Sequence, residues 1–162
     1  MPKVALIMGS KSDWPSLRGC VEVLKKFEIE VEVHVASAHR TPETVAAFAA
    51  NARENGFEVI IAAAGKAAHL AGVIAGHTTL PVIGIPVKSS FMDGLDSLLS
   101  TVQMPTGIPV ATVAVGGGDN AAYLAAQMLS IKYPILAEKL LAHREQMAAA
   151  IEADDRQIQD EV

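Results

Sequence analysis

The amino-acid sequence predicts a three-layer αβα sandwich, an α/β fold in which helices cover both faces of a central parallel sheet. Strand-like runs, either apolar or alternating, recur five times along the 162 residues, and a helical stretch follows each of them. These connections are long enough to join parallel strands through right-handed crossovers. No linker or shift in composition divides the chain. We therefore expect a single domain over residues 1–162, in which residues 134–162 form a C-terminal helix that packs in subunit contacts or on its own sheet.

The first half of the chain shows both kinds of strand pattern. Val4–Met8 is an apolar run of the kind that is buried on both faces of a parallel sheet, whereas residues 30–35 alternate between polar and apolar. Thr41 supplies a capping hydroxyl, and Pro42 suits the first position of a helix. The elements predicted here are strand 4–8, helix 14–27, strand 30–35, helix 42–55 and strand 59–64.

The second half continues the alternation. Asp93 is placed to cap a helix whose apolar residues have helical spacing, and the glycines at 116–118 precede an alanine-rich helix. Pro134 suits the first turn of the C-terminal helix, which becomes polar beyond Glu152. The elements predicted here are helix 70–76, strand 82–87, helix 95–102, strand 110–115, a helix from 121 and the C-terminal helix from 134.

The composition excludes several classes of protein. Hydrophobic residues make up 51% of the chain and charged residues only 19%, which excludes disorder and implies extensive burial. The mean hydropathy of +0.31 is high, yet no apolar run approaches the roughly 20 residues of a membrane span. We therefore expect subunit contacts and no membrane partner. The net charge of −5, without a face rich in lysine and arginine, argues against nucleic acid as a partner.

The sequence also argues against a disulfide, a metal site and a targeting segment. Cys20 is the only cysteine and lies on the apolar stripe of a helix, which excludes an internal disulfide and favours a packed thiol. No histidine and carboxylate pair with the i, i+4 spacing of metal ligands lies within one predicted helix, so we expect no metal. The N-terminus lacks a basic segment followed by an apolar one, and a cytoplasmic location is therefore expected.

Polar side chains follow the first three predicted strands at the point where each strand ends. In an open parallel sheet these ends share one rim, where ligands bind, so the side chains are expected to converge. A histidine there can exchange protons near neutral pH, and an arginine is a permanent anion-binding group. The residues in question are Ser10, Ser12 and Asp13 after the first strand, Ser37, His39 and Arg40 after the second, and Gly65, Lys66 and His69 after the third.

The loop from Gly9 to Asp13 has hydroxyls and backbone N–H groups at a helix start, which suits a phosphate. It matches neither a Walker A loop nor a dinucleotide-binding fingerprint, and Asp13 serves equally well as a helix cap. No Gly-x-Ser-x-Gly nucleophile motif is present. From the residues alone, proton transfer by His39 on an anchored, phosphorylated substrate and an ordinary surface loop both stay open.

Four strings together resemble one family closely and cover nearly the whole chain. They are Met8-Gly-Ser-Lys-Ser-Asp-Trp14, Ser37-Ala-His-Arg-Thr-Pro42, Ala67-Ala-His-Leu70 and Asp96-Ser-Leu-Leu-Ser-Thr-Val-Gln-Met-Pro105. They resemble the PurE family of N5-carboxyaminoimidazole ribonucleotide mutases in purine biosynthesis. The resemblance implies a flavodoxin-like fold, a homo-octamer, a small ribonucleotide substrate and no cofactor. The implied reaction moves the substrate's carboxylate from nitrogen N5 to ring carbon C4. An ATP-dependent synthetase that makes this substrate is implied as a functional neighbour.

The resemblance also implies roles for individual residues. His39 matches the general acid/base, Ser10 and Asp13 match substrate-binding residues, and Arg40 matches a phosphate-binding arginine. The further matches to residues that line the pocket are Ser12, Ser37, Gly65 and His69.

The chain departs from the family pattern at two positions. Lys66 and Ala71 replace a glycine and a proline that many members have. We expect Lys66 to face solvent or a subunit contact, because a cation in a pocket for carbon dioxide would have to lose its hydration.

Three alternatives to the mutase are considered. The nearest is an aminoimidazole ribonucleotide carboxylase that uses free carbon dioxide, although the Ala67–Leu70 string and His39-Arg40 favour the mutase. A flavodoxin-like module that binds a flavin or nucleotide without turnover is disfavoured by an aromatic content of only 4%. A structural oligomer with a vestigial site would explain the apolar helices and leave the polar rim unexplained.

Overall fold

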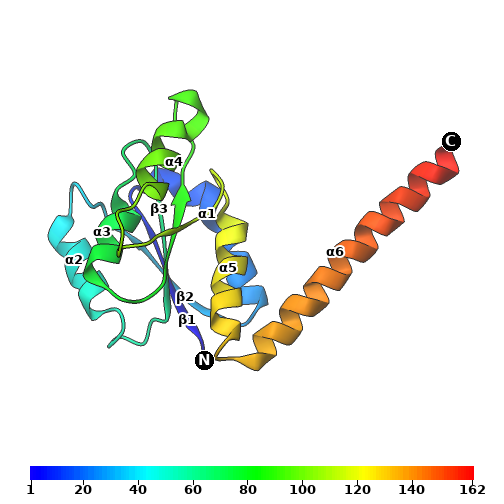
Figure 1. Cartoon of the computed structure of the whole chain (residues 1–162), viewed down its shortest axis with the longest axis horizontal. Coiled ribbons are helices and arrows are strands. Elements are labelled where there is room, and N and C mark those ends of the chain that lie inside the picture. The colour runs from blue at the N-terminus through cyan, green and yellow to red at the C-terminus, as the bar shows by residue number, and fades with distance from the viewer.

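The computed structural model describes all 162 residues and contains one sheet of five parallel strands in the order β2-β1-β3-β4-β5 (Figure 1). The chain passes from β1 outward to β2 and then returns to the other side of β1, so the direction of winding reverses between β1 and β3. Such a reversal opens a crevice at the carboxyl ends of the strands. The strands are β1 Lys3–Met8, β2 Glu30–Val35, β3 Val59–Ala64, β4 Val82–Pro86 and β5 Ala111–Thr112.

Helices cover both faces of the sheet, which confirms the predicted three-layer sandwich. The strands supply both layers of the core, since successive side chains of β1 point to opposite faces: Val4, Leu6 and Met8 pack with α1 and α5, and Ala5 and Ile7 with α2 and α3. The helices are α1 Trp14–Lys26, α2 Pro42–Asn51, α3 Leu70–His77, α4 Leu95–Val102, α5 Gly118–Ser130 and α6 Pro134–Glu161.

Three predicted boundaries and one predicted cap were wrong. Helix α5 begins at Gly118, three residues before the expected start at 121. The fifth strand covers only residues 111–112 of the expected 110–115, because its ladder with β4 consists of Ala111 and Thr112 alone. The helix expected over 42–55 ends at Asn51, and a turn leads from there to Gly56. Asp93 does not cap α4: it lies in a turn with φ of 57°, and Gly94 is the N-cap.

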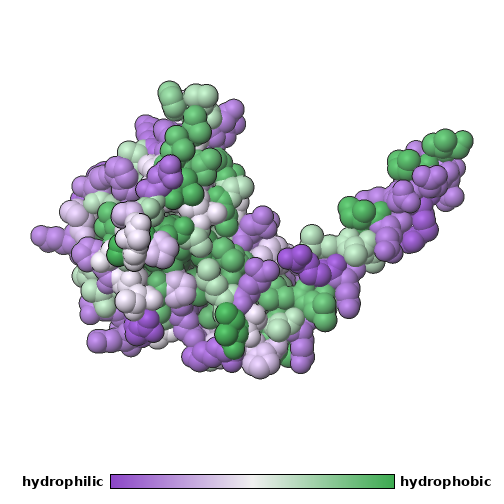
Figure 2. Space-filling model, in the orientation of Figure 1, coloured by the Kyte–Doolittle hydropathy of each residue, from purple (hydrophilic) through white to green (hydrophobic).

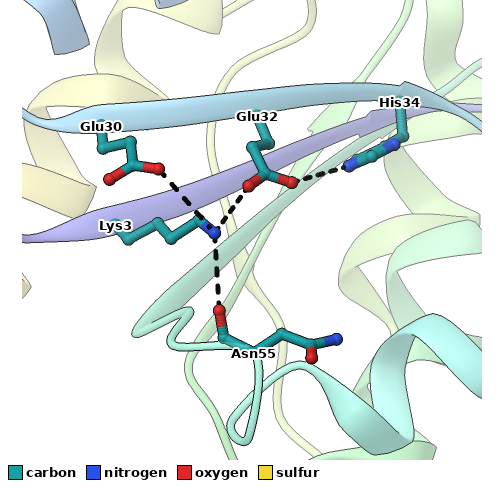
Figure 3. A network of polar contacts seen from close by, with 5 residues as sticks. All are labelled: Lys3, Glu30, Glu32, His34 and Asn55. Atoms are coloured by element: carbon teal, nitrogen blue, oxygen red, sulfur yellow. Dashed lines mark hydrogen bonds and ion pairs between the residues drawn. The ribbon is translucent and has the colours of Figure 1, made fainter.

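The opposite edge strand, β2, carries a network of charges (Figure 3). Lys3 Nζ on β1 lies 2.6 Å from Glu32 Oε1 and 3.8 Å from Glu30 Oε1, and Glu32 Oε2 lies 3.4 Å from His34 Nε2. The hydrogen bond and charge of Lys3 lower the pKa of Glu32 below its ordinary value. Charged side chains on an edge strand oppose pairing with another sheet edge. These ion pairs also hold β2, the strand that precedes the His39 loop, against β1.

Helix α6 projects away from the sandwich (Figure 1). Its first turns pack on α5, where Leu136 is buried and the His143 ring stacks on the Tyr123 ring at 4.7 Å between centroids. The rest of the helix has exposed apolar residues, among them Met147 and Ile151, interspersed with polar ones (Figure 2). None of the helices has the length and apolar character needed to span a membrane.

Candidate active site

A cavity of about 640 Å³ lies at the carboxyl ends of β1 to β4. The loops that follow these four strands form its walls, which confirms that the polar residues at the strand ends converge. All nine residues singled out at the strand ends line the cavity: Ser10, Ser12, Asp13, Ser37, His39, Arg40, Gly65, Lys66 and His69.

Two histidines from different loops meet in this cavity. His39 Nε2 lies 2.9 Å from His69 Nδ1, and the two rings meet edge to face at 5.0 Å between centroids. In such a contact one nitrogen carries the proton and the other accepts it. A proton gained by His39 at Nε2 is therefore held by His69, and the pair is suited to take up and return a single proton. His39 Nδ1 makes no hydrogen bond within the protein.

Arg40 connects the loop after β2 to the loop after β1. Its Nη2 donates to the Gly9 carbonyl at 2.9 Å and its Nε to Ser37 Oγ at 3.4 Å, and Ser37 Oγ also accepts from the Arg40 backbone N–H at 3.1 Å. Thr41 is the N-cap residue of α2, as expected, but its hydroxyl does not cap the helix. It instead accepts from Ser37 N and donates to Ser37 O. The guanidinium is thus oriented before any anion binds.

The loop after β1 presents two hydroxyls and a carboxylate. Ser10 Oγ and Ser12 Oγ lie 2.9 Å apart, and Ser12 N donates to Ser10 Oγ. Asp13 precedes α1, yet its side chain makes no capping hydrogen bond, so capping does not account for this residue. Burial raises the pKa of the Asp13 carboxyl above its ordinary value, and a backbone hydrogen bond from Ser10 partly offsets the rise. Because the side chain caps no helix, its carboxyl oxygens are placed to accept hydrogen bonds from a ligand.

Helix α4 holds the loop after β3 through small polar side chains. Ser100 Oγ accepts from Ala68 N at 2.9 Å, and Thr101 Oγ1 lies 3.5 Å from Ala68 O. The Ser100 hydroxyl proton has two main acceptors within reach, Asp96 O at 2.7 Å and Lys66 O at 3.2 Å. Gly84 on β4 makes room for this approach, since a Cβ there would lie 2.4 Å from Thr101 Cγ2. The α4 string that carried the family resemblance thus positions the loop that ends in His69.

The loop after β4 also contributes to the cavity, although the sequence pattern was not assigned a site there. Val87, Lys88 and Ser89 line the cavity, and the Val87 carbonyl accepts from Ser97 Oγ of α4 at 2.7 Å. The rule that placed the other loops at the rim applies equally to a fourth parallel strand, so this loop was predictable. Lys66 also lines the cavity and is exposed, which is compatible with the solvent-facing position expected from the sequence.

The site combines groups for proton transfer with groups for anion binding. The histidine pair supplies the first, and Arg40 with the serine hydroxyls supplies the second. No group of three histidine, cysteine, aspartate or glutamate side chains is arranged to hold a metal ion.

Comparison with known proteins gives consistent matches. The family model described as AIR carboxylase matches residues 3–150. The N5-carboxyaminoimidazole ribonucleotide mutase of Saccharolobus solfataricus is 58% identical over 147 residues, which cover 91% of this chain and 93% of that protein. The mutase of the same name from Mycobacterium tuberculosis strain H37Rv is 51% identical and covers 98% and 91%. The crystal structure of Treponema denticola PurE superimposes with a TM-score of 0.86 at 30% identity, covering 97% of this chain and 98% of that one.

Proposed function

The chain belongs to the AIR carboxylase family, and we infer that it is an isomerase that converts N5-carboxyaminoimidazole ribonucleotide to 4-carboxy-5-aminoimidazole ribonucleotide in purine biosynthesis. The observation that carries this inference is an identity of 58% to a mutase of that name over nearly the full length of both chains. The alternative function, a carboxylase that uses free carbon dioxide, is tested by an assay with two substrates.

We propose that the ribonucleotide lies with its phosphate toward the loops after β1 and β2. Arg40 and the hydroxyls of Ser10, Ser12 and Ser37 supply a positive charge and several donors there, which is what a phosphate requires. Asp13 accepts hydrogen bonds from the ribose hydroxyls. The imidazole ring then points toward the loop after β3, where Gly65 allows close approach of the backbone and the two histidines meet.

In the reaction that we propose, His39 acts as general acid and then as general base. It donates a proton to N5 as the N5–carboxylate bond breaks, which leaves aminoimidazole ribonucleotide and carbon dioxide in the cavity. Carbon C4 then attacks the carbon dioxide, and His39 removes the proton from C4. The proton lent to N5 is thereby recovered, so the isomerisation is balanced. His69 holds the proton-bearing form of His39 through the 2.9 Å contact. Keeping both fragments in place is the main task of the site.

The test is an assay of the purified protein with two substrates in parallel. We expect rapid conversion of N5-carboxyaminoimidazole ribonucleotide and little conversion of aminoimidazole ribonucleotide at modest bicarbonate. Efficient use of the second substrate would instead identify a carboxylase. Replacing the acid/base in His39→Ala is expected to lower kcat by roughly 10²- to 10⁴-fold. An active His39→Ala variant would refute the mechanism.

We also propose that the protein is a cytoplasmic homo-octamer. Support comes from apolar side chains that the single chain leaves exposed: Leu99 (48%) and Val102 (42%) on α4, and Met147 and Ile151 on α6. Residues 134–162 would then lie in subunit contacts. Light scattering should give a mass eight times that of the 17.0 kDa chain. Functional coupling to an ATP-dependent synthetase follows from the lability of an N-carboxylated substrate, and is tested by measuring transfer between the two enzymes.

A further inference from the structure

Lys66 occupies a backbone conformation that L-amino acids rarely adopt. Its φ is +55°, in the left-handed region, where a side chain is strained and glycine is not. The conformation is held because the Lys66 carbonyl accepts a hydrogen bond from Ala68 N at 2.9 Å and lies 3.2 Å from Ser100 Oγ of α4. Strained residues of this kind cluster at ligand sites, where the side chain has a use that offsets the strain.

Lys66 is also the cavity's one lysine or arginine without a protein partner. Of the other two, Arg40 donates to the Gly9 carbonyl and Ser37 Oγ, and Lys88 Nζ lies 3.2 Å from Asp93 Oδ1. No hydrogen bond or ion pair engages Lys66 Nζ within the protein. Lys66 is exposed at the open cavity, so its ammonium group keeps most of its hydration until a ligand arrives. The desolvation that argued against a cation here is therefore small.

The position of Lys66 indicates which anion it takes. The substrate has two anionic groups, and the Arg40 side of the cavity already supplies the donors for the phosphate. Lys66 lies on the other side, three residues before His69, which contacts His39. Resting on the proposed function, we propose that Lys66 binds the migrating carboxylate and makes the site prefer carboxylated ribonucleotides. An ammonium on a flexible stem is a point charge with rotatable donors, so it can follow the carboxylate from N5 to C4.

The experiment compares two ligands that differ only in the carboxylate. Calorimetry measures the Kd of 4-carboxy-5-aminoimidazole ribonucleotide and of aminoimidazole ribonucleotide for the wild type and for Lys66→Gln. Loss of one charge-assisted contact at an exposed site should weaken binding of the carboxylated ligand about 10-fold, with less than about 2-fold change for the other. Lys66→Arg should restore most of the loss. Lys26→Gln, which removes an exposed charge on α1, should change neither Kd.

Lys66→Gly separates a binding role from a structural one. Glycine relieves the backbone strain, so this variant should unfold about 2–4 °C above the wild type while binding the carboxylated ligand as weakly as Lys66→Gln does. Equal weakening of both ligands by Lys66→Gln would place Lys66 at the phosphate and overturn the proposal, and so would unchanged binding of both. A wild type that binds neither ligand would overturn the proposed function as well.

Discussion

Ser100 is expected to hold the catalytic loop in place through one hydroxyl. Ala68 is 1% exposed, and its backbone N–H donates to Ser100 Oγ at 2.9 Å. In Ser100→Ala this buried N–H loses one of its two acceptors and keeps the Lys66 carbonyl at 2.9 Å, which costs about 0.5–1.5 kcal/mol of the free energy of unfolding. For a domain of this size, each kcal/mol lowers Tm by about 2–4 °C. His69 follows Ala68 directly, so a displaced loop also separates the histidine pair, and kcat should fall about 10-fold or more.

The assay is thermal unfolding and steady-state kinetics of wild type and Ser100→Ala at one protein concentration. Ser90→Ala is the matched control, because Ser90 is exposed and makes no hydrogen bond in the structure. We expect the control to match the wild type in both Tm and kcat. If Ser100→Ala unfolded at the wild-type temperature with an unchanged kcat, α4 would not position the loop, and the account of the site given above would be wrong.

Three further predictions follow from the site and the surface. His69→Asn, which removes the partner of His39, should lower kcat by roughly 10- to 100-fold, a smaller fall than replacement of His39 causes. It should also alter the pH profile of kcat, and an unchanged profile would contradict the pairing. Asp13→Asn should raise Tm at pH 7 and leave Tm unchanged well below pH 3.8. Burial raises the pKa of Asp13 in the folded state, so ionisation of this carboxyl destabilises the fold as the pH rises from the ordinary pKa of 3.8 past the raised pKa. The amide of asparagine does not ionise and causes no such loss. Equal Tm differences at both pH values would refute this. Leu99→Asp, which puts a charge on the exposed apolar face of α4, should lower the mass measured by light scattering, whereas an intact octamer would exclude α4 from the interface.

Much of the fold was predictable because it depends on local pattern. The spacing of apolar residues distinguishes β1 from α1, and buried runs such as β3 need no partner to be recognised as strands. The candidate site was predictable for a related reason. Parallel strands end at one edge, so polar residues after β1, β2 and β3 had to meet there, as they do in the cavity.

Helix α4 and strand β5 show where the local sequence pattern is insufficient to predict the structure. The apolar residues of α4 predicted a helix, but the structure turns Ser97 and Thr101 toward the sheet and leaves Leu99 and Val102 exposed. Periodicity identifies the apolar face of a helix without saying what covers that face. The truncated β5 has a similar cause, because its length depends on how many of its residues pair with β4, which is a tertiary contact.

The sequence by itself determined the alternation of strands and helices, the edge at which the polar loops gather and the residue types available there. Tertiary structure decided the 2.9 Å contact between His39 and His69, the orientation of Arg40 by Gly9, and the left-handed conformation of Lys66. The physical reason is that secondary structure follows from interactions between near neighbours in the chain. The contacts of His39 and Arg40 instead join residues about 30 positions apart, and the backbone of Lys66 is held by a contact with α4. Only packing of the whole domain sets such distances.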